Sequence, residues 1–240
     1  MSWLEGRVTE NRHWTESLFS IRAEGPRLSF EAGQFVRIAL DVESGRVARP
    51  FSFVNPPQDP VLEFYGIVVP EGPLSPRLAT LRPGDALHVA SNPAGFLVLS
   101  ELPDAETLWL ISTGTGLAPF LSILRTETPW RRFKNVVVVH AVRFAKELVY
   151  REMIGKTPAR YVSFVSRENH AGSLSGRIPA AVRDGRLEAA AGLKIAPETS
   201  QVMLCGNPDM LRDTTAVLME RGLRKHRRRA PGHLTVESFW

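Results

Sequence analysis

The spacing of apolar residues along the sequence changes near residue 100. In the first part, short apolar runs alternate with polar residues and are separated by Gly, Pro and Asn. Several short strands at such spacing predict an antiparallel barrel or sandwich. The runs lie around Val8 and over residues 18–21, 34–40, 51–54, 62–69 and 86–90. One short helix is predicted over 75–81, with Ser75 as its N-cap and Pro76 in the first helical position.

After residue 104, strand-like runs alternate with helix-like runs. The strand-like runs cover 107–111, 135–140, 160–165 and 201–205, and helical patterns begin at Leu117, Phe144 and Pro208 and extend over 178–191. Residues 136–139 are all valine, which suits a parallel strand covered by helices. The alternation predicts a doubly wound parallel sheet. We therefore expect two domains, an antiparallel β-barrel over 1–100 and an α/β domain over 101–240.

A glycine turn follows the first strand of the second part. Gly114, Thr115 and Gly116 stand between the strand and the helix. Glycine lets the backbone turn tightly and approach a ligand, and a helix start offers N–H groups, so the turn favours a pyrophosphate. The dinucleotide fingerprint is incomplete, because Pro119 stands where a third glycine or alanine is expected. The alternative interpretation is an ordinary strand-to-helix turn.

Basic and hydroxyl residues follow the neighbouring strands. Ligands of open parallel sheets bind beyond the carboxyl ends of the strands. Arg143 follows the second strand, Ser166 and Arg167 follow the third, and Arg177 comes shortly after them. Each arginine alone is compatible with an ordinary surface charge. Grouped together, with no acid placed to hold the ribose hydroxyls, they predict a 2′-phosphate site and hence NADPH rather than NADH.

The last strand of the second part ends in a thiol and a glycine. Cys205, Gly206, Asn207 and Pro208 lead directly into a predicted helix start. By itself Cys205 would be interpreted as a small buried side chain. No residue beside it in sequence resembles an activating base, so we do not predict a covalent nucleophile.

The run of Arg49, Pro50, Phe51 and Ser52 is the most informative piece of the first part. At the start of a strand, Arg49 and Phe51 would share one face and Ser52 would point to the other. In such a strand, the arginine can bind a phosphate, the phenyl ring can stack on a flat ring of a ligand, and the serine hydroxyl can form a hydrogen bond to a ring nitrogen. The alternative is a plain edge strand with Phe51 in the core. The two aromatic residues that end the sequence are expected to cover something.

Composition narrows the class of protein. No apolar run approaches the length of a membrane span, and the N-terminal residues lack a signal-peptide pattern. The single cysteine excludes an intrachain disulfide and a cluster held by four thiolates of this chain, so a cytoplasmic setting is expected. A net charge of +5 and a pI near 9.8 favour an acidic partner. The basic run 224–229 is interpreted as a solvated tail, since no nucleic-acid-binding motif accompanies it.

Together, these motifs resemble the ferredoxin/flavodoxin–NADP reductase family over essentially the whole chain. Residues 49–52 resemble the family's FAD-binding Arg-x-Tyr-Ser, and residues 114–119 resemble its Gly-Thr-Gly-Ile-Ala-Pro. Residues 205–208 resemble Cys-Gly-x-Pro, and residues 236–240 are similar to the Val-Glu-x-Tyr-Trp ending of the bacterial branch. The chain has Phe51 and Phe239 where the family usually has tyrosine. Stacking is retained, while each missing hydroxyl removes a possible hydrogen bond worth about 1 kcal/mol.

The resemblance implies an FAD-binding barrel, an NADP-binding α/β domain and a C-terminal aromatic tail that returns to the flavin. The residues that the resemblance implies for FAD binding are Arg49, Pro50, Phe51, Ser52, Tyr65, Gly66, Ile67, Leu74, Ser75, Thr115, Phe239 and Trp240. The residues that the resemblance implies for NADP binding are Gly114, Thr115, Gly116, Arg143, Ser166, Arg167, Arg177, Cys205, Gly206, Asn207 and Pro208. It places Ser52, Cys205 and Phe239 at the reacting rings, as the catalytic set, and it implies no metal.

The implied activity is hydride transfer between NADPH and FAD, with single electrons passed to or from ferredoxin or flavodoxin. The carrier would be a separate, small, acidic protein, and the enzyme a monomer without nucleic acid or membrane insertion. Two alternatives stay open. One is an NAD(P)H-dependent reductase component that serves an oxygenase or free flavins, and the other is a non-enzymatic flavin-binding module.

Overall fold

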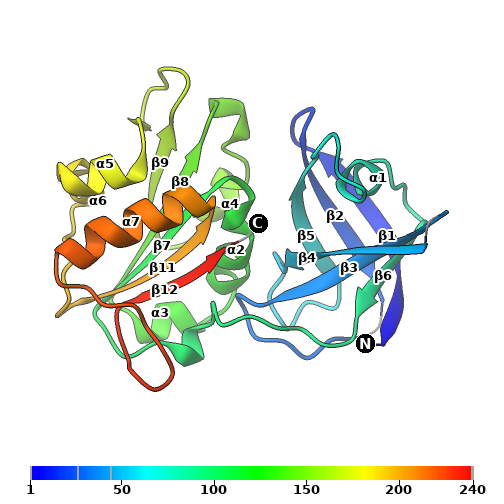
Figure 1. The fold of residues 1–240 in the computed structure, drawn as a ribbon, viewed down its shortest axis with the longest axis horizontal. Helices are drawn as coiled ribbons and strands as arrows, with labels where there is room; N and C mark the ends of the chain where they lie inside the picture. The colour runs from blue at the N-terminus through cyan, green and yellow to red at the C-terminus, as the bar shows by residue number, and fades with distance from the viewer. Residues whose placement is uncertain (1, 26, 44, 239–240) are drawn as a thin grey trace. The chain divides into compact units, whose positions relative to one another are not determined.

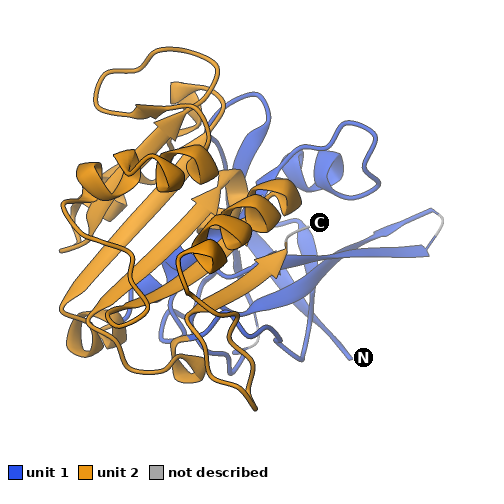
Figure 2. Ribbon diagram, turned by 60° about the vertical axis from the view of Figure 1, so that its left-hand side comes forward, with its two compact units in different colours: residues 1–98, 118–126 blue, residues 99–117, 127–240 orange. Residues whose placement is uncertain are grey.

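The computed structural model describes residues 2–25, 27–43 and 45–238, which form two compact units. Figure 2 colours residues 1–98 and 118–126 as the first unit and residues 99–117 and 127–240 as the second. The chain thus enters the second unit at Leu99, close to the boundary expected from sequence. It then returns residues 118–126 to the first unit, which a single boundary near residue 100 does not describe.

The first unit contains an antiparallel sheet with the order β4-β3-β6-β1-β2-β5 among the described residues (Figure 1). Its strands are β1 (Trp3–His13), β2 (Leu18–Glu24), β3 (Phe35–Val42), β4 (Gly45–Ser52), β5 (Leu62–Ile67) and β6 (Ala86–Ala90). One half of the long strand β1 pairs with β6 and the other with β2, and its register shifts between Val8 and Glu10. Such a bulge bends a strand, which helps the sheet to curl.

The two edges of this sheet meet. Phe53, directly after β4, forms an antiparallel bridge with Phe64 on β5. Next to it, the Val54 N–H donates to the Glu63 carbonyl at 2.8 Å. Alternating residues of the strands point inward and form one apolar cluster that includes Phe19, Ile21, Ile38, Phe53, Phe64 and Leu87. The predicted antiparallel barrel is confirmed.

Helix α2 (Ala118–Leu124) belongs to this first unit. Ser122 Oγ donates to the Asn55 carbonyl at 2.7 Å. Arg125, just after the helix, reaches Asp59 at 3.3 Å and Glu63 at 3.1 Å. The helix and the residue after it are therefore fixed by polar contacts to strand β5 and to the turn that joins β4 to β5.

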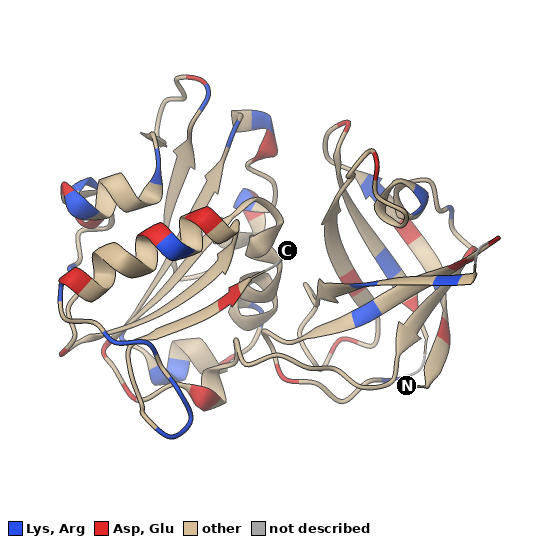
Figure 3. Ribbon diagram, viewed as in Figure 1, with Lys and Arg blue, Asp and Glu red and all other residues tan. Residues whose placement is uncertain are grey.

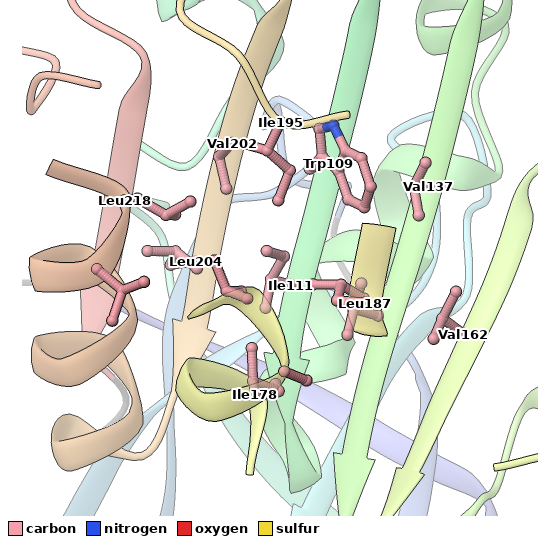
Figure 4. Close-up of a cluster of buried hydrophobic side chains, with 14 of the residues drawn as sticks. Trp109, Ile111, Val137, Val162, Ile178, Leu187, Ile195, Val202, Leu204 and Leu218 are labelled. Atoms are coloured by element: carbon pink, nitrogen blue, oxygen red, sulfur yellow. The ribbon is translucent and has the colours of Figure 1, made fainter. Parts of the chain in front are cut away.

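The second unit contains a parallel sheet with the order β10-β9-β8-β7-β11-β12 in the part of the chain described. Its strands are β7 (Thr107–Thr113), β8 (Asn135–Val142), β9 (Arg160–Val165), β10 (Leu174–Ser175), β11 (Ser200–Gly206) and β12 (Leu234–Ser238). Trp109, Ile111 and Val137 belong to the buried cluster on one face (Figure 4). Their neighbours Leu110 and Val138 are fully buried as well. Burial on both faces explains the unbroken apolar runs, and the predicted doubly wound sheet is confirmed.

Helices connect the parallel strands, and α5, α6 and α7 lie over one face of the sheet (Figure 1). Besides α2, the helices are α1 (Ser75–Ala79), α3 (Thr128–Arg132), α4 (Arg151–Gly155), α5 (Ile178–Arg183), α6 (Arg186–Ala191) and α7 (Pro208–Glu220). Short 3₁₀ helices are η1 (Leu99–Glu101), η2 (Gly114–Leu117) and η3 (Ala145–Glu147).

Three local predictions were wrong. The helical run 178–191 is two helices, because Gly185 adopts φ 82° between them and a left-handed residue ends a helix. The run from Phe144 forms only η3 before α4 begins, with Tyr150 at φ 63° in between. Ser75 is the first residue of α1 rather than its N-cap, which is Leu74. Its hydroxyl instead accepts a hydrogen bond from the Val69 N–H at 2.9 Å.

Candidate functional site

The predicted flavin-binding run lies at the end of strand β4. Sequence placed residues 49–52 at the start of a strand, but β4 begins earlier, at Gly45, and ends at Ser52. The alternation is as expected, since Arg49 is exposed, Phe51 is half-buried and Ser52 is buried. The run therefore lies where the edges of the barrel meet, beside β5.

Phe51 is supported from β5 by a glycine. A Cβ on Gly66 would lie 2.9 Å from both Phe51 Cε1 and Phe19 Cζ, so the absence of a side chain lets the two rings approach the strand. Phe51 also meets Phe64 edge-on, with ring centroids 6.4 Å apart and planes at 79°. Its ring is thus held in place while part of it stays exposed. A planar ligand can stack on such a ring.

The hydroxyl of Ser52 is a buried polar group without a protein partner. Ser52 is 1% exposed, and its Oγ makes no hydrogen bond within the described residues. Most buried side-chain polar atoms have a partner, so an orphan hydroxyl needs an explanation. A hydrogen bond to a bound ligand is one that fits the position of Ser52 beside Phe51.

Arg49 borders a basic pocket. The pocket has a volume of about 600 Å³ and is lined by Trp3, Arg37, Arg46, Val47, Ala48, Arg49 and Pro73. Arg46 is paired with Asp41, at 2.7 Å. Arg49 reaches only the Ala48 carbonyl, at 2.8 Å, and has no carboxylate partner in the described part of the chain. An unpaired arginine in this place suits a phosphate oxygen.

The other predicted flavin residues of this unit lie on β5 and at the start of α1. Tyr65 is 1% exposed and flanks Gly66, and Ile67 is half-buried. Leu74 is buried against the barrel core. The structure thus brings residues 49–52 and 65–67 together, and it uses the Ser75 hydroxyl to close the turn before α1.

In the second unit, the glycine turn is locked to the end of β11. The Asn207 N–H donates to Thr113 Oγ1 at 2.9 Å. A Cβ on Gly116 would lie 2.6 Å from the Cys205 carbonyl oxygen, so this residue packs directly on the backbone of β11. Gly114 opens the turn at φ 52°, and its Cβ position has no heavy atom within 4 Å. Thr115, between the two glycines, is buried. The turn is held from one side and open at its tip.

Cys205 lies at the carboxyl end of β11 and is fully buried. Burial, and then the charge of Glu237, raise the pKa of its thiol well above the usual value. The thiol is therefore protonated at neutral pH, which agrees with the expectation that it is no covalent nucleophile. Glu237 was not predicted as a site residue. It lies beside Cys205 in the register of β11 and β12, a pairing that sequence spacing does not reveal.

Asn207 and Pro208 start helix α7 as the sequence predicted. Asn207 is the N-cap, and its side chain accepts hydrogen bonds from the Asp209 and Met210 N–H groups at 2.9 and 3.3 Å. Pro208 occupies the first turn, where a missing N–H costs nothing. Both residues are exposed at the same sheet edge as Cys205.

The three predicted arginines follow three adjacent strands. Arg143 follows β8, Arg167 follows β9, and Arg177 comes after β10. The Arg167 N–H donates to the Arg143 carbonyl at 2.9 Å, and all three side chains are exposed. None of the three has a carboxylate partner among the described residues. Ser166 joins them, its hydroxyl donating to the Val142 carbonyl at 3.2 Å.

Two acids lie close to these arginines in sequence, and both are engaged by backbone N–H groups. Glu147 Oε2 accepts hydrogen bonds from the Arg143 and Phe144 N–H groups at 2.9 and 3.1 Å. Glu168 Oε1 accepts one from the Ala145 N–H at 2.5 Å. Both carboxylates are thereby used to fold the loop that carries Arg143. Their engagement with backbone N–H groups leaves the guanidinium groups available for a phosphate.

The basic run 224–229 lies at the other end of the parallel strands, away from their carboxyl ends. Figure 3 shows it in the loop that leads into β12, and so at the amino ends of the strands. It is a hairpin rather than the expected tail, since Arg227 and Ala230 exchange backbone hydrogen bonds of 3.1 and 2.9 Å. Arg228 pairs with Glu101 at 2.8 Å. This run contributes nothing to the edge that carries Arg143.

Phe239 and Trp240, predicted at the flavin, lie outside the described residues. Within the described ranges, no three His, Cys, Asp or Glu side chains are grouped so that they could hold a metal ion. The same ranges contain no helix of the length and apolarity needed to cross a membrane.

Comparisons with known proteins agree with this arrangement. The family described as oxidoreductase NAD-binding domain matches residues 110–216. A flavodoxin/ferredoxin–NADP reductase of Shigella flexneri is 51% identical over 245 residues, covering 99% of each chain. A ferredoxin–NADP reductase of Pseudomonas aeruginosa is 37% identical and covers 96% of this chain and 95% of its own. A crystal structure of a ferredoxin NADP+ reductase from Neisseria gonorrhoeae, with bound FAD and NADP, is 31% identical. It superimposes with a TM-score of 0.97 and covers 100% of both chains.

Proposed function

Because the chain belongs to the flavodoxin/ferredoxin–NADP reductase family, we propose that it binds FAD and NADPH and exchanges electrons with a carrier protein. The observation that carries the proposal is the row of arginines without carboxylate partners, on adjacent strand ends beside the glycine turn. The chemistry that FAD supplies when bound is hydride exchange with NADPH and single-electron exchange with the carrier. The chain supplies binding, orientation and protection of the rings.

In the first unit, the residues at the meeting edges of the barrel fit a flavin. The half-exposed ring of Phe51 provides a stacking surface. The orphan hydroxyl of Ser52 provides a hydrogen bond for a polar atom of the ring system. Arg49 and its basic pocket provide for the pyrophosphate, because a guanidinium matches phosphate oxygens in charge and geometry. We assign Tyr65, Gly66, Ile67, Leu74 and Ser75 to the same cofactor.

In the second unit, the carboxyl edge of the parallel sheet fits NADPH. We assign Arg143, Ser166, Arg167 and Arg177 to the 2′-phosphate, which carries the charge that distinguishes NADPH from NADH. Gly114, Thr115 and Gly116 lie at the dinucleotide, together with residues 205–208. The protonated thiol of Cys205 contributes packing and polarity rather than a bond to substrate. Hydride transfer between two rings requires no general base, so orientation of the reactants is the chain's main contribution to the rate.

The electron carrier is a separate protein. The single cysteine excludes an iron–sulfur cluster held by four thiolates of this chain. A net charge of +5 favours a small acidic partner such as a ferredoxin or flavodoxin. We place the activity in the cytoplasm and expect a monomer. The large apolar residues that are exposed in the described chain are few: Val69, Phe96, Met219 and Val236.

The deciding experiment is an absorption spectrum of the purified protein before and after anaerobic addition of NADPH, with NADH in parallel. Flavin bands at roughly 380 and 450 nm that bleach faster with NADPH than with NADH support the proposal. Flavin bands that NADPH does not bleach would leave a flavin-binding module. A colourless protein that takes up no added FAD would contradict the proposal. A reduced protein that passes electrons to free flavin but not to ferredoxin or flavodoxin would favour an oxygenase or flavin reductase component.

A further inference from the structure

A buried histidine lies beneath the glycine turn and has no role in the function proposed above. His140 is on β8 and is fully buried in a strand whose other buried residues are all valine. It pairs in register with Ser112 on β7, two residues before Gly114. Its Nε2 lies 3.2 Å from the Gly114 carbonyl oxygen. On its other side, Nδ1 lies 3.4 Å from the hydroxyl of Tyr161 on β9.

These two contacts determine which nitrogen carries the proton. A carbonyl oxygen only accepts hydrogen bonds, so Nε2 must be the donor to Gly114. In a neutral imidazole the other nitrogen is then an acceptor, and it accepts from the Tyr161 hydroxyl. Burial lowers the pKa of His140 to about 4, so the ring is neutral at pH 7. Burial raises the pKa of Tyr161 to about 12, so its hydroxyl keeps the proton to donate. The hydrogen bonds run from Tyr161 through His140 to Gly114.

The direction of the Gly114 carbonyl fixes the direction of the next N–H. The described chain contains no cis peptide bond, and in a trans peptide the C=O and the N–H point to opposite sides. Because the Gly114 carbonyl points toward His140 in the interior, the Thr115 N–H points away from it. The left-handed φ of 52° at Gly114, which favours glycine, is compatible with this orientation.

We propose that His140, with Tyr161 behind it, is a positioning residue that fixes the Gly114–Thr115 peptide so that the Thr115 N–H is presented to an anionic group of the dinucleotide. The identity of the ligand rests on the proposed function. The orientation of the Gly114–Thr115 peptide rests on the contacts of His140 alone. On one side of the turn, the Thr113 hydroxyl and the packing of Gly116 lock it to β11. On the other side, His140 ties it to β8 and β9.

The first test measures binding of NADP+ by the flavin difference spectrum of the holoenzyme. His140→Leu removes both nitrogens and frees the peptide to reorient, so its Kd for NADP+ should rise about tenfold. His140→Gln keeps a donor and should stay within about threefold of the parent, and Tyr161→Phe should weaken binding about threefold. Thr214→Val is the matched control, because Thr214 is fully buried in α7 and its hydroxyl has no partner in the described chain. It should leave the Kd unchanged.

Turnover separates positioning from a general structural defect. In His140→Leu, the KM for NADPH should rise while kcat and FAD content stay near the parent values, as expected for lost uniform binding. A fall of kcat together with loss of FAD would contradict the inference. So would an unchanged Kd in His140→Leu.

The second test does not depend on any variant folding. In ¹⁵N NMR spectra of the histidine-labelled holoenzyme, His140 should show a protonated Nε2 and an unprotonated Nδ1 between pH 6 and 8. An Nδ1–H tautomer would overturn the inference, because Nε2 could then not donate to Gly114. Failure of the proposed function gives a different result. In that case the parent protein itself neither binds NADP+ nor is bleached by NADPH, whatever the tautomer of His140.

Discussion

Thr113 and Gly206 lie so close that no side chain fits between them. A Cβ on Gly206 would stand 2.2 Å from Thr113 Oγ1 and 2.9 Å from the Thr113 carbonyl oxygen. Gly206 also adopts φ 135°, which other residues rarely reach. The ends of β7 and β11 can therefore come together only because this position is glycine.

Replacing that glycine should be costly. In Gly206→Ala, backbone strain and the clash with Thr113 should lower the free energy of unfolding by about 2–4 kcal/mol. Gly155→Ala is the control, because a Cβ there meets no heavy atom within 4 Å, and it should be neutral or slightly stabilising. Urea denaturation of both variants measures the difference. Equal stabilities would show that the turn adapts to a side chain.

Arg143 should set the choice of nucleotide. Arg143→Ala removes a charge that has no carboxylate partner among the described residues, so kcat/KM for NADPH should fall about 10- to 100-fold. The value for NADH, which lacks the 2′-phosphate, should change little. Arg183→Ala, which removes an exposed arginine 3.9 Å from Glu220, should alter neither value. If NADPH turnover survives in Arg143→Ala, the 2′-phosphate is bound elsewhere.

Ser52 should affect the apoprotein and the holoprotein in opposite ways. Because its buried hydroxyl has no protein partner in the described chain, Ser52→Ala should leave the apoprotein as stable as the parent or more stable. The same change should weaken FAD binding about fivefold, by removing a hydrogen bond of about 1 kcal/mol. Ser122→Ala breaks an existing bond to Asn55 and should instead lower apoprotein stability by about 1 kcal/mol. Denaturation and FAD titration distinguish the two variants.

The stability of the second unit should depend on pH through His140. Burial lowers its pKa from 6.5 to about 4 in the folded chain, so only the unfolded chain takes up this proton as the pH falls below 6.5. The free energy of unfolding should therefore drop, by about 2 kcal/mol at pH 5, and the loss is complete only below about pH 4. His140→Gln lacks this term, and comparing urea denaturation of parent and variant at pH 7 and pH 5 isolates it. Parallel pH curves would mean that His140 is accessible to protons in the fold.

Association with an acidic carrier should slow as salt is added. The chain carries a net charge of +5, and long-range attraction is screened within about 10 Å at 0.1 M salt. Stopped-flow association rates with ferredoxin or flavodoxin should fall steeply between about 0.02 and 0.3 M NaCl, with dissociation less affected. A rate independent of salt would exclude electrostatic steering.

The sequence predicted what depends on local pattern and motif. Alternating runs identified the barrel, the four consecutive valines 136–139 identified a parallel strand, and Asn207 with Pro208 identified the start of α7. Its errors came where a left-handed backbone conformation or a tertiary contact decides. Asp184 and Gly185 divide what the apolar pattern joins, and the Ser75 hydroxyl bonds to Val69 instead of capping α1.

Other site features required the register of the sheets. Glu237 contributes at Cys205 only because β12 pairs with β11, and His140 reaches Gly114 only because β8 lies beside β7. Glu147 follows Arg143 closely in the sequence, yet only the fold shows that its carboxylate is used by backbone N–H groups. A polar residue inside a buried strand, such as His140, was the one available signal for a role at the turn.

The return of residues 118–126 to the first unit limits how this protein can be divided. A fragment cut at residue 98 would lack Ser122 and Arg125, which bond to β5 and to the turn before it. It would also uncover the surface at Gly33, whose Cβ position lies 3.2 Å from the Ile123 side chain. The barrel is therefore not a separable module. A transfer of the barrel to another protein must therefore carry residues 118–126 together with residues 1–98.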